Sequence, residues 1–290
     1  MACHTPYYVP NPNPYRDGNK EVPVPCGRCP DCQANRVAQW SFRLMEEDKV
    51  SVSSIFLTLT YNNEHITLSR NGFPTLVKQD FPLFMKKLRN YHFKAKWPHK
   101  IKYYMVGEYG SDTWRPHYHA IMFNANPDLI DSAWTDRDGK SIGHIHIGKV
   151  SGNSIFYTCG YLNKGKRVPR HARDDRIKEY STSSKGLGLS YLTKEAVAYH
   201  KADLSRNYVT FLGGRQVALP RYYKDKLQFT DAELDFQRSL ARNANMQGEI
   251  LNEKRFRRIY GDDADYEKYK YEQKMGSYNK FLNNDKNRKL

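Results

Sequence analysis

Two β-rich segments joined by a short turn constrain the fold of this chain more than any other feature. Residues 101–109 (IKYYMVGEY) and 117–123 (HYHAIMF) are rich in aromatic and β-branched side chains, which favour strands. The turn between them, which contains SDTW, is too short for the crossover that parallel strands need. Pro116 opens the second strand at a position where a missing backbone donor is tolerated. The sequence therefore predicts an antiparallel hairpin.

Further strands and helices are predicted on both sides of this hairpin. Residues 54–61 and 143–150 have the composition of strands, whereas residues 1–25 are rich in Pro and Asn and indicate an extended arm. The fold class is therefore α+β, a central antiparallel sheet of about five strands flanked by helices. The predicted helices cover 33–49, 80–93, 154–164 and 193–203, and residues 209–223 indicate a strand, a turn and an extended exit.

The chain divides by composition into three predicted parts. Residues 1–35 form an N-terminal arm with a cysteine cluster, and residues 36–227 form the domain that contains the sheet. Residues 228–290 form a helical and highly charged C-terminal tail, which begins where Thr230 and Glu233 have the spacing of a capping box.

The charge balance indicates a polyanionic partner. Among 290 residues, 47 are Lys or Arg and 31 are Asp or Glu, which gives a formal net charge of +16. With 22 Tyr and 13 Phe, the chain has both cations for phosphates and aromatic rings for unpaired bases, so single-stranded nucleic acid is the expected partner. The basic segments Lys86–Lys102 and Lys164–Arg173 are candidate DNA tracks, although most charge runs are merely solvated.

The hydropathy pattern argues against a membrane protein and against wholesale disorder. Hydrophobic residues make up 39% of the chain, enough for a core. No apolar stretch approaches the ~20 residues of a membrane helix, and the N-terminus lacks the order of a signal peptide. We therefore expect no membrane partner and a cytoplasmic location.

The second predicted strand of the hairpin presents two imidazoles on one face. Residues two apart in a strand share a face, so His117 and His119 point the same way and Tyr118 points into the opposite layer. Glu108 lies in the preceding strand and would complete a two-histidine, one-carboxylate metal site. The alternative is a polar strand face with a solvated carboxylate. His144 and His146 form a rival pair on one strand face, without an evident carboxylate partner.

A predicted helix presents two phenols four residues apart. Tyr157 and Tyr161 lie on one side of this helix, and Lys164 follows one turn later. Paired aromatic residues on a helix are more often core packing than chemistry. Combined with the metal site, they describe the attack of a tyrosine on a phosphodiester, because the metal would polarise the phosphate. Lys164 would offset the developing negative charge.

Three of the five cysteines lie close together in the sequence. Cys26, Cys29 and Cys32 supply three thiolates, and a structural zinc site usually has four ligands. Cys3 is the expected fourth ligand, with His4 as its substitute. An iron–sulfur motif would need a further cysteine at a place where none occurs. Three reduced thiols in a tight turn are the simpler alternative, and Cys159 is expected to serve packing.

Several segments together resemble the HUH endonuclease superfamily. They are FLTLTY (56–61), RPHYHAIMF (115–123) and the Y-x-x-x-Y-x-x-K pattern from Tyr157 to Lys164. The segments VPCGRCPDC, SSKGLGLSYL and LPRYYKDKL resemble, more closely, the replication initiators of microvirus-type single-stranded DNA phages of the gokushovirus branch. This resemblance extends over about residues 3–227.

The resemblance implies a rolling-circle replication initiator that nicks and transfers single-stranded DNA through a 5′-phosphotyrosine. It assigns the catalytic Mg²⁺ or Mn²⁺ to His117, His119 and Glu108, and the chemistry to Tyr157, Tyr161 and Lys164. Tyr161 is ranked first because Lys164 follows it, although Gly160 stands where relatives often carry a cation. A host helicase, a host polymerase and the bacterial cytoplasm are the implied setting.

Two other functions stay open at this point. The chain could be a non-catalytic single-stranded nucleic-acid-binding protein with a structural zinc site. It could also be a metal phosphoesterase that uses water, which would cut DNA without becoming attached to it.

Overall fold

The computed structural model describes residues 3, 5–11, 20–110, 112–161, 168–211 and 213–287, without the side chains of Tyr161, Ser277, Tyr278 and residues 280–287. The chain clusters into two compact units. One is formed by residues 1–39 and 192–286, and the other by residues 40–191 with the last four residues. The division of the sequence at residues 35 and 227 stays a prediction.

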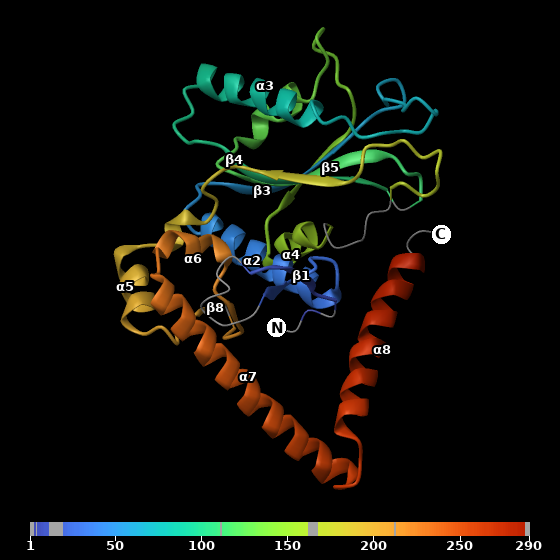
Figure 1. Ribbon diagram of the computed structural model, residues 1–290. Coiled ribbons are helices and arrows are strands. Elements are labelled where there is room, and N and C mark those ends of the chain that lie inside the picture. The colour runs from blue at the N-terminus through green and yellow to red at the C-terminus, as the bar shows by residue number, and fades with distance from the viewer. Residues whose placement is uncertain are drawn as a thin grey trace. The chain divides into compact units, whose positions relative to one another are not determined.

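A five-stranded sheet is the centre of the second unit (Figure 1). Its strands run in the order β6-β3-β5-β4-β7, and every neighbouring pair is antiparallel. The predicted α+β fold class is therefore confirmed. The strands are β3 (Ser54–Thr60), β4 (Lys102–Tyr109), β5 (Pro116–Phe123), β6 (Ile145–Lys149) and β7 (Tyr180–Ser183).

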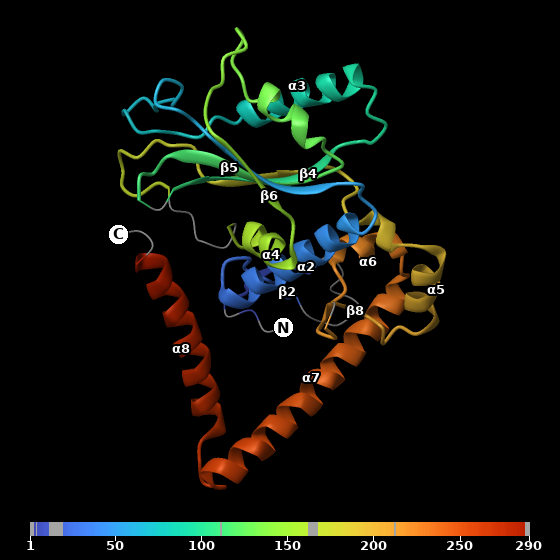
Figure 2. The ribbon, with the colours of Figure 1, turned by 180° about the vertical axis from the view of Figure 1, so that it is seen from behind.

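Helix α3 (Asp80–Lys94) covers one face of this sheet and α4 (Gly152–Tyr161) lies on the other, as both views show (Figures 1 and 2). The buried residues of α3 follow helical spacing, so that its apolar stripe faces the sheet. The main core forms between this stripe and one face of β3, β4 and β5. It includes Leu57, Leu59, Phe81, Phe84, Leu88, Met105, Tyr118 and Trp134.

The other face of the sheet is packed by two helical segments. Helix α4 packs on β4 and β5. The second half of α2 (Pro30–Asp48) lies near β4, where the Trp40 and Tyr104 rings are 4.8 Å apart and Lys102 forms an ion pair with buried Glu47. This face is therefore only partly covered by apolar side chains, and it is the face that carries the predicted histidines.

The first unit contains two small hairpins and most of the C-terminal helices. A hairpin of β1 (Tyr7–Pro10) and β2 (Glu21–Val24) precedes the first part of α2. The remaining elements are α5 (Lys194–Ala202), β8 (Tyr208–Thr210), β9 (Gln216–Ala218), α6 (Arg221–Leu227), α7 (Asp231–Tyr260) and α8 (Tyr266–Asn287). The helical C-terminal extension is confirmed, and α7 begins with the predicted capping box of Thr230 and Glu233. None of the helices in the described part of the chain is long and apolar enough to cross a membrane.

Three local predictions were wrong. The N-terminal arm is not merely extended, because β1 and β2 pair within it. The exit after Pro220 is the helix α6, whose Tyr223 and Leu227 are buried one helical turn apart. The edge strand β7 was not predicted, because YSTS is short and polar and lacks the apolar pattern of a strand.

A buried ion pair supports the turn that leads into β5. The Asp174 carboxylate accepts two hydrogen bonds of 2.8 Å from the Arg176 guanidinium, and both residues are buried. The same guanidinium lies over the rings of Trp114 and Tyr109, at 4.8 and 5.1 Å. Trp114 immediately precedes the Arg115-Pro116-His117 segment, so the pair supports the start of the histidine-bearing strand.

Asp174→Asn tests this support. We expect the free energy of unfolding to fall by about 3 kcal/mol, because the buried Arg176 charge loses its partner. The hydrogen bond from Arg176 holds the pKa of Asp174 well below its ordinary value. The stability from this pair is therefore present above the unfolded pKa of about 3.9 and is lost as pH falls below it.

Urea unfolding of wild type and Asp174→Asn from neutral pH to about pH 3 measures both effects. The exposed Asp138→Asn is the control. The support is refuted if Asp174→Asn matches this control at neutral pH, or if the difference grows as the pH is lowered.

Candidate metal centre and adjoining tyrosine helix

Three potential metal ligands meet at one end of the β4–β5 hairpin. Glu108 lies directly opposite His117 in the pairing register, and His119 follows two residues later on the same face. Glu108 Oε1 is 3.0 Å from His117 Nε2 and 3.3 Å from His119 Nε2. One ligand atom of each residue lies within 4.8 Å of the others. The structure thus brings together the three residues that the sequence singled out.

The other ring nitrogen of each histidine is already engaged. His117 Nδ1 is 3.0 Å from the Arg115 carbonyl oxygen, which can only accept, so Nδ1 carries the hydrogen and donates it. His119 Nδ1 is 2.9 Å from the Thr58 hydroxyl. Such outer partners fix the tautomer and leave Nε2 free for a metal.

The contact of His117 with Glu108 fits a cation between them. A neutral His117 that donates through Nδ1 turns a lone pair on Nε2 towards a carboxylate oxygen 3.0 Å away. Two acceptors at that distance repel each other unless a proton or a metal ion is shared between them. Two imidazole nitrogens and one carboxylate oxygen form a donor set that holds a divalent ion and leaves positions open for other oxygens.

Helix α4 presents Tyr157 to this group. The rings of His119 and Tyr157 have centroids 6.3 Å apart in an edge-to-face arrangement, and Tyr157 is 53% exposed. Its neighbours Thr158 and Cys159 are buried and hold the helix on the sheet, as expected for Cys159. Tyr157 is therefore turned away from the core, towards the metal ligands and solvent.

The second predicted tyrosine lies four residues further along the same helix. Tyr161 is the last residue of α4, and its side chain is outside the described part. Lys164 also lies outside the described residues, as does much of the basic segment Lys164–Arg173. Their roles stay predictions.

The rival histidine pair lies on the neighbouring strand. His146 in β6 is opposite Thr58, and His144 precedes the strand; both are exposed. Among the described residues, neither belongs to a group of three or more potential metal ligands. This strand therefore borders the candidate site without supplying a second metal group there.

Two residues near the site were missed by the sequence reasoning. Thr58 bonds to His119, and Phe56 stacks on the same ring with centroids 5.4 Å apart. Both belong to the alternate positions of β3 that face away from the core. The alternation of SIFLTLT carries this signal, but only the β3–β5 register shows which histidine each residue meets.

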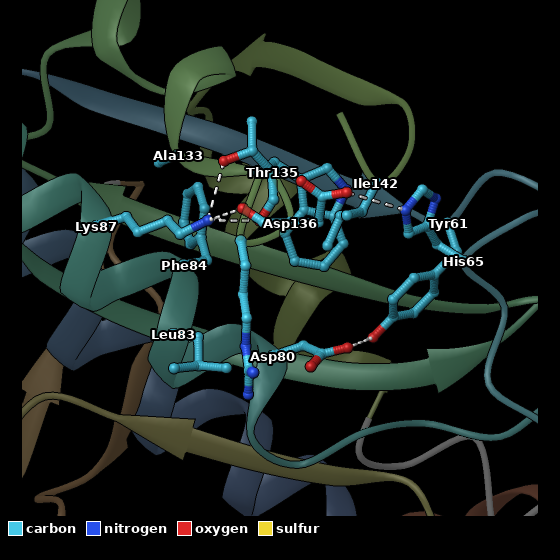
Figure 3. Close-up of a pocket in the computed structure, with 12 residues that line it drawn as sticks. Tyr61, His65, Asp80, Leu83, Phe84, Lys87, Ala133, Thr135, Asp136 and Ile142 are labelled. Atoms are coloured by element: carbon cyan, nitrogen blue, oxygen red, sulfur yellow. Dashed lines mark hydrogen bonds and ion pairs between the residues drawn. The ribbon is translucent and has the colours of Figure 1, made fainter. Parts of the chain in front are cut away.

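A separate pocket of ≈ 350 Å³ lies on the core side of the sheet, next to α3 (Figure 3). Its polar side chains bond to one another or to nearby backbone. Tyr61 donates to Asp80, and Lys87 donates to the carbonyl oxygens of Thr135 and Asp136. Burial raises the pKa of Asp80. This pocket and the α3 part of the basic segment Lys86–Lys102 thus lie on the face opposite the metal group.

Four cysteines form the other group of potential metal ligands in the described residues. Cys3, Cys26, Cys29 and Cys32 have sulfur atoms that all lie within 4.8 Å of one another, whereas His4 is outside the described residues. Cys3, the expected fourth member, therefore lies beside the other three.

Comparison with known proteins identifies the class. Residues 54–166 match the family model of the replication-associated protein ORF2. This segment contains Glu108, His117, His119 and Tyr157, as well as every strand of the sheet except β7. The match therefore covers both the sheet and the candidate site.

Individual relatives come from small phages. The replication-associated protein VP4 of Bdellovibrio phage phiMH2K is 32% identical over 217 residues, which are 69% of this chain and 66% of that protein. ORF2 of Spiroplasma virus 4 is 28% identical over 83% of this chain and 81% of its own length, and ORF4 of Chlamydia phage 1 is 28% identical over 73% and 56%. Both are also named replication-associated proteins. No solved structure matches the chain. The predicted resemblance is confirmed, and the chain belongs with the replication-associated proteins of small phages.

Replacement of the outer partner tests whether the histidines bind metal. We expect Thr58→Val to lower the affinity for Mn²⁺ about 10–100-fold, because His119 loses the partner that fixes its ring. Calorimetric titration of the purified protein with Mn²⁺ measures the change.

Thr60→Val is the matched control, since Thr60 lies on the same strand and face. Within the described residues, the ring nitrogens of the two histidines bond to Thr58, Arg115 and Glu108 rather than to the Thr60 hydroxyl. Equal affinities for the two variants would contradict the role of Thr58.

Proposed function

We propose that this chain is a replication initiator that nicks single-stranded DNA and stays attached to the 5′ end through a phosphotyrosine. The observation that carries the proposal is the convergence of Glu108, His117 and His119 with Tyr157 on one face of the sheet. Relatives named replication-associated proteins and a net charge of +16 support a DNA substrate.

The protein residues position a phosphodiester between the metal group and the helix. Glu108, His117 and His119 would hold a divalent ion, for which Mg²⁺ and Mn²⁺ are suited because they accept phosphate oxygens. The bound ion supplies positive charge to a nonbridging oxygen of the scissile phosphate. Arg115 and Thr58 keep the histidine rings in the orientation that this requires.

Tyr157 is the proposed nucleophile. Its oxygen attacks phosphorus, so that a phenol–phosphorus bond forms and the bond from phosphorus to the 3′ oxygen breaks. The phenolic proton passes to solvent and the 3′ oxygen leaves as a hydroxyl. The phosphoester bond is conserved in the phosphotyrosine, and a 3′ hydroxyl can later attack it and rejoin the strand.

Tyr161 is proposed as the second nucleophile, with Lys164 as a cation that offsets developing charge. Four-residue spacing places it on the same side of α4 as Tyr157. This order reverses the sequence-based ranking of the two tyrosines, because Tyr157 is the one whose described ring contacts His119. Two phenols would allow a second cut while the first DNA end is still held.

In the infected host cell, this reaction would start rolling-circle replication at an origin. The free 3′ hydroxyl is the primer that a host polymerase needs, and a host helicase would separate the strands.

A covalent-adduct assay tests the function. The protein is incubated with Mn²⁺ and labelled single-stranded oligonucleotides from the cognate origin, and the products are separated on a denaturing gel. We expect a shifted protein–DNA adduct in wild type. Tyr157→Phe should reduce its formation about 10³-fold or more, as loss of a catalytic nucleophile does.

Tyr271→Phe is the matched control, because Tyr271 is 64% exposed on α8 and should leave the adduct unchanged. Tyr161→Phe should retain the first adduct and lose the second transfer. DNA binding without an adduct would favour the non-catalytic binding protein. Cutting that survives the double Tyr→Phe replacement would favour a phosphoesterase that uses water.

A further inference from the structure

The N-terminal hairpin brings distant cysteines to one place. β1 and β2 pair with Tyr7 opposite Val24, so the residues before β1 and those after β2 lie at the same end of the hairpin. Cys3 precedes β1 and Cys26 follows β2 there. The backbone N–H of Cys26 donates to Cys3 Sγ at 3.2 Å, which fixes the contact across 23 residues of sequence.

The next two cysteines lie in a tight turn that leads into helix α2. Gly27 has a φ of +71°, a conformation that favours glycine, and it turns the chain back after Cys26. The backbone N–H groups of Arg28 and Cys29 donate to Cys26 Sγ at 3.4 and 3.3 Å. Cys32 follows in the first turn of α2. The turn thus directs backbone donors at a sulfur, an arrangement that stabilises a thiolate.

The spacing of the four sulfurs matches a single tetrahedral ion. A zinc ion with ligands at about 2.3 Å in tetrahedral geometry separates its sulfurs by about 3.8 Å. Cys3 Sγ and Cys29 Sγ are 3.9 Å apart, and all four sulfurs are within 4.8 Å of one another. The separation of 3.9 Å is nearly twice the length of a disulfide bond. One ion, rather than a cluster of several iron atoms, fits a space of this size.

The hairpin needs such a link because it has little core of its own. None of the residues of β1 or β2 is buried, and Tyr7 and Tyr8 are 50% and 64% exposed. A two-stranded hairpin alone is marginally stable in water. By contrast, Cys26 and Cys29 are buried at its base, so the burial in this region centres on the sulfurs.

We propose that Cys3, Cys26, Cys29 and Cys32 bind a structural Zn²⁺ that ties the N-terminal hairpin to the first turn of α2. This site is separate from the group of Glu108, His117 and His119 and takes no part in the nicking reaction. The inference does not depend on the proposed function, since it rests on the thiol geometry alone.

Metal analysis of the full-length protein tests the site. We expect about one zinc per chain after dialysis, and an X-ray absorption spectrum with four sulfur neighbours at about 2.3 Å. Cys29→Ser should lose this sulfur-bound zinc. Cys159→Ser is the matched control, because this buried cysteine lies outside the group and should leave the zinc in place. Glu108→Gln, which alters the other metal group, should also leave it in place.

A second measurement does not depend on the variants. Zinc removal by a strong chelator should speed tryptic cleavage after Arg28 about tenfold or more, because the turn then opens locally. The site is refuted by zinc that has only nitrogen and oxygen neighbours, or by full zinc content in Cys29→Ser. It is equally refuted by iron with inorganic sulfide, or by a disulfide among these cysteines under reducing purification.

Discussion

The pairing register of β4 with β5 is the constraint on which the candidate site depends. Because side chains alternate between the two faces of a strand, a slip of one residue would turn His117 and His119 into the core and Tyr118 out to solvent. Tyr118 prevents this slip. It is fully buried, and its hydroxyl donates to the Val77 carbonyl and meets the Tyr61 hydroxyl at 2.8 Å. Packing on one face of the sheet thus specifies the chemistry on the other.

The same division explains why the site can stay polar. The apolar core gathers under α3, so the opposite face has no need of a continuous hydrophobic layer. Helix α4 meets that face through Ile155, Thr158 and Cys159, which are buried, and this leaves Tyr157 exposed at the edge of the metal group. A phenol at that position can reach a substrate from solvent, which a phenol buried among core residues could not do.

Much of the fold and of the metal group could be predicted from local patterns. The alternation around Tyr118 predicted which histidines share a face, and the short turn predicted that Glu108 would lie on the adjacent strand. The polar edge strand β7 and the helix α6 were missed, because a short YSTS segment and a segment that begins with Pro220 carry weak local signals. The roles of Thr58 and Phe56 depend on long-range pairing of β3 with β5, which no local pattern contains. The separation of Tyr157 from the metal group likewise depends on how α4 packs on the sheet.

The distance between a bound metal and Tyr157 tests the central claim most directly. A fluorotyrosine incorporated only at position 157 gives one fluorine resonance, which paramagnetic Mn²⁺ broadens at short range. We predict strong broadening when Mn²⁺ is added to the otherwise wild-type chain and its loss when His119→Ala is introduced. A sharp resonance at saturating Mn²⁺ would mean that the phenol and the metal do not meet at one phosphate, and would contradict the proposed mechanism.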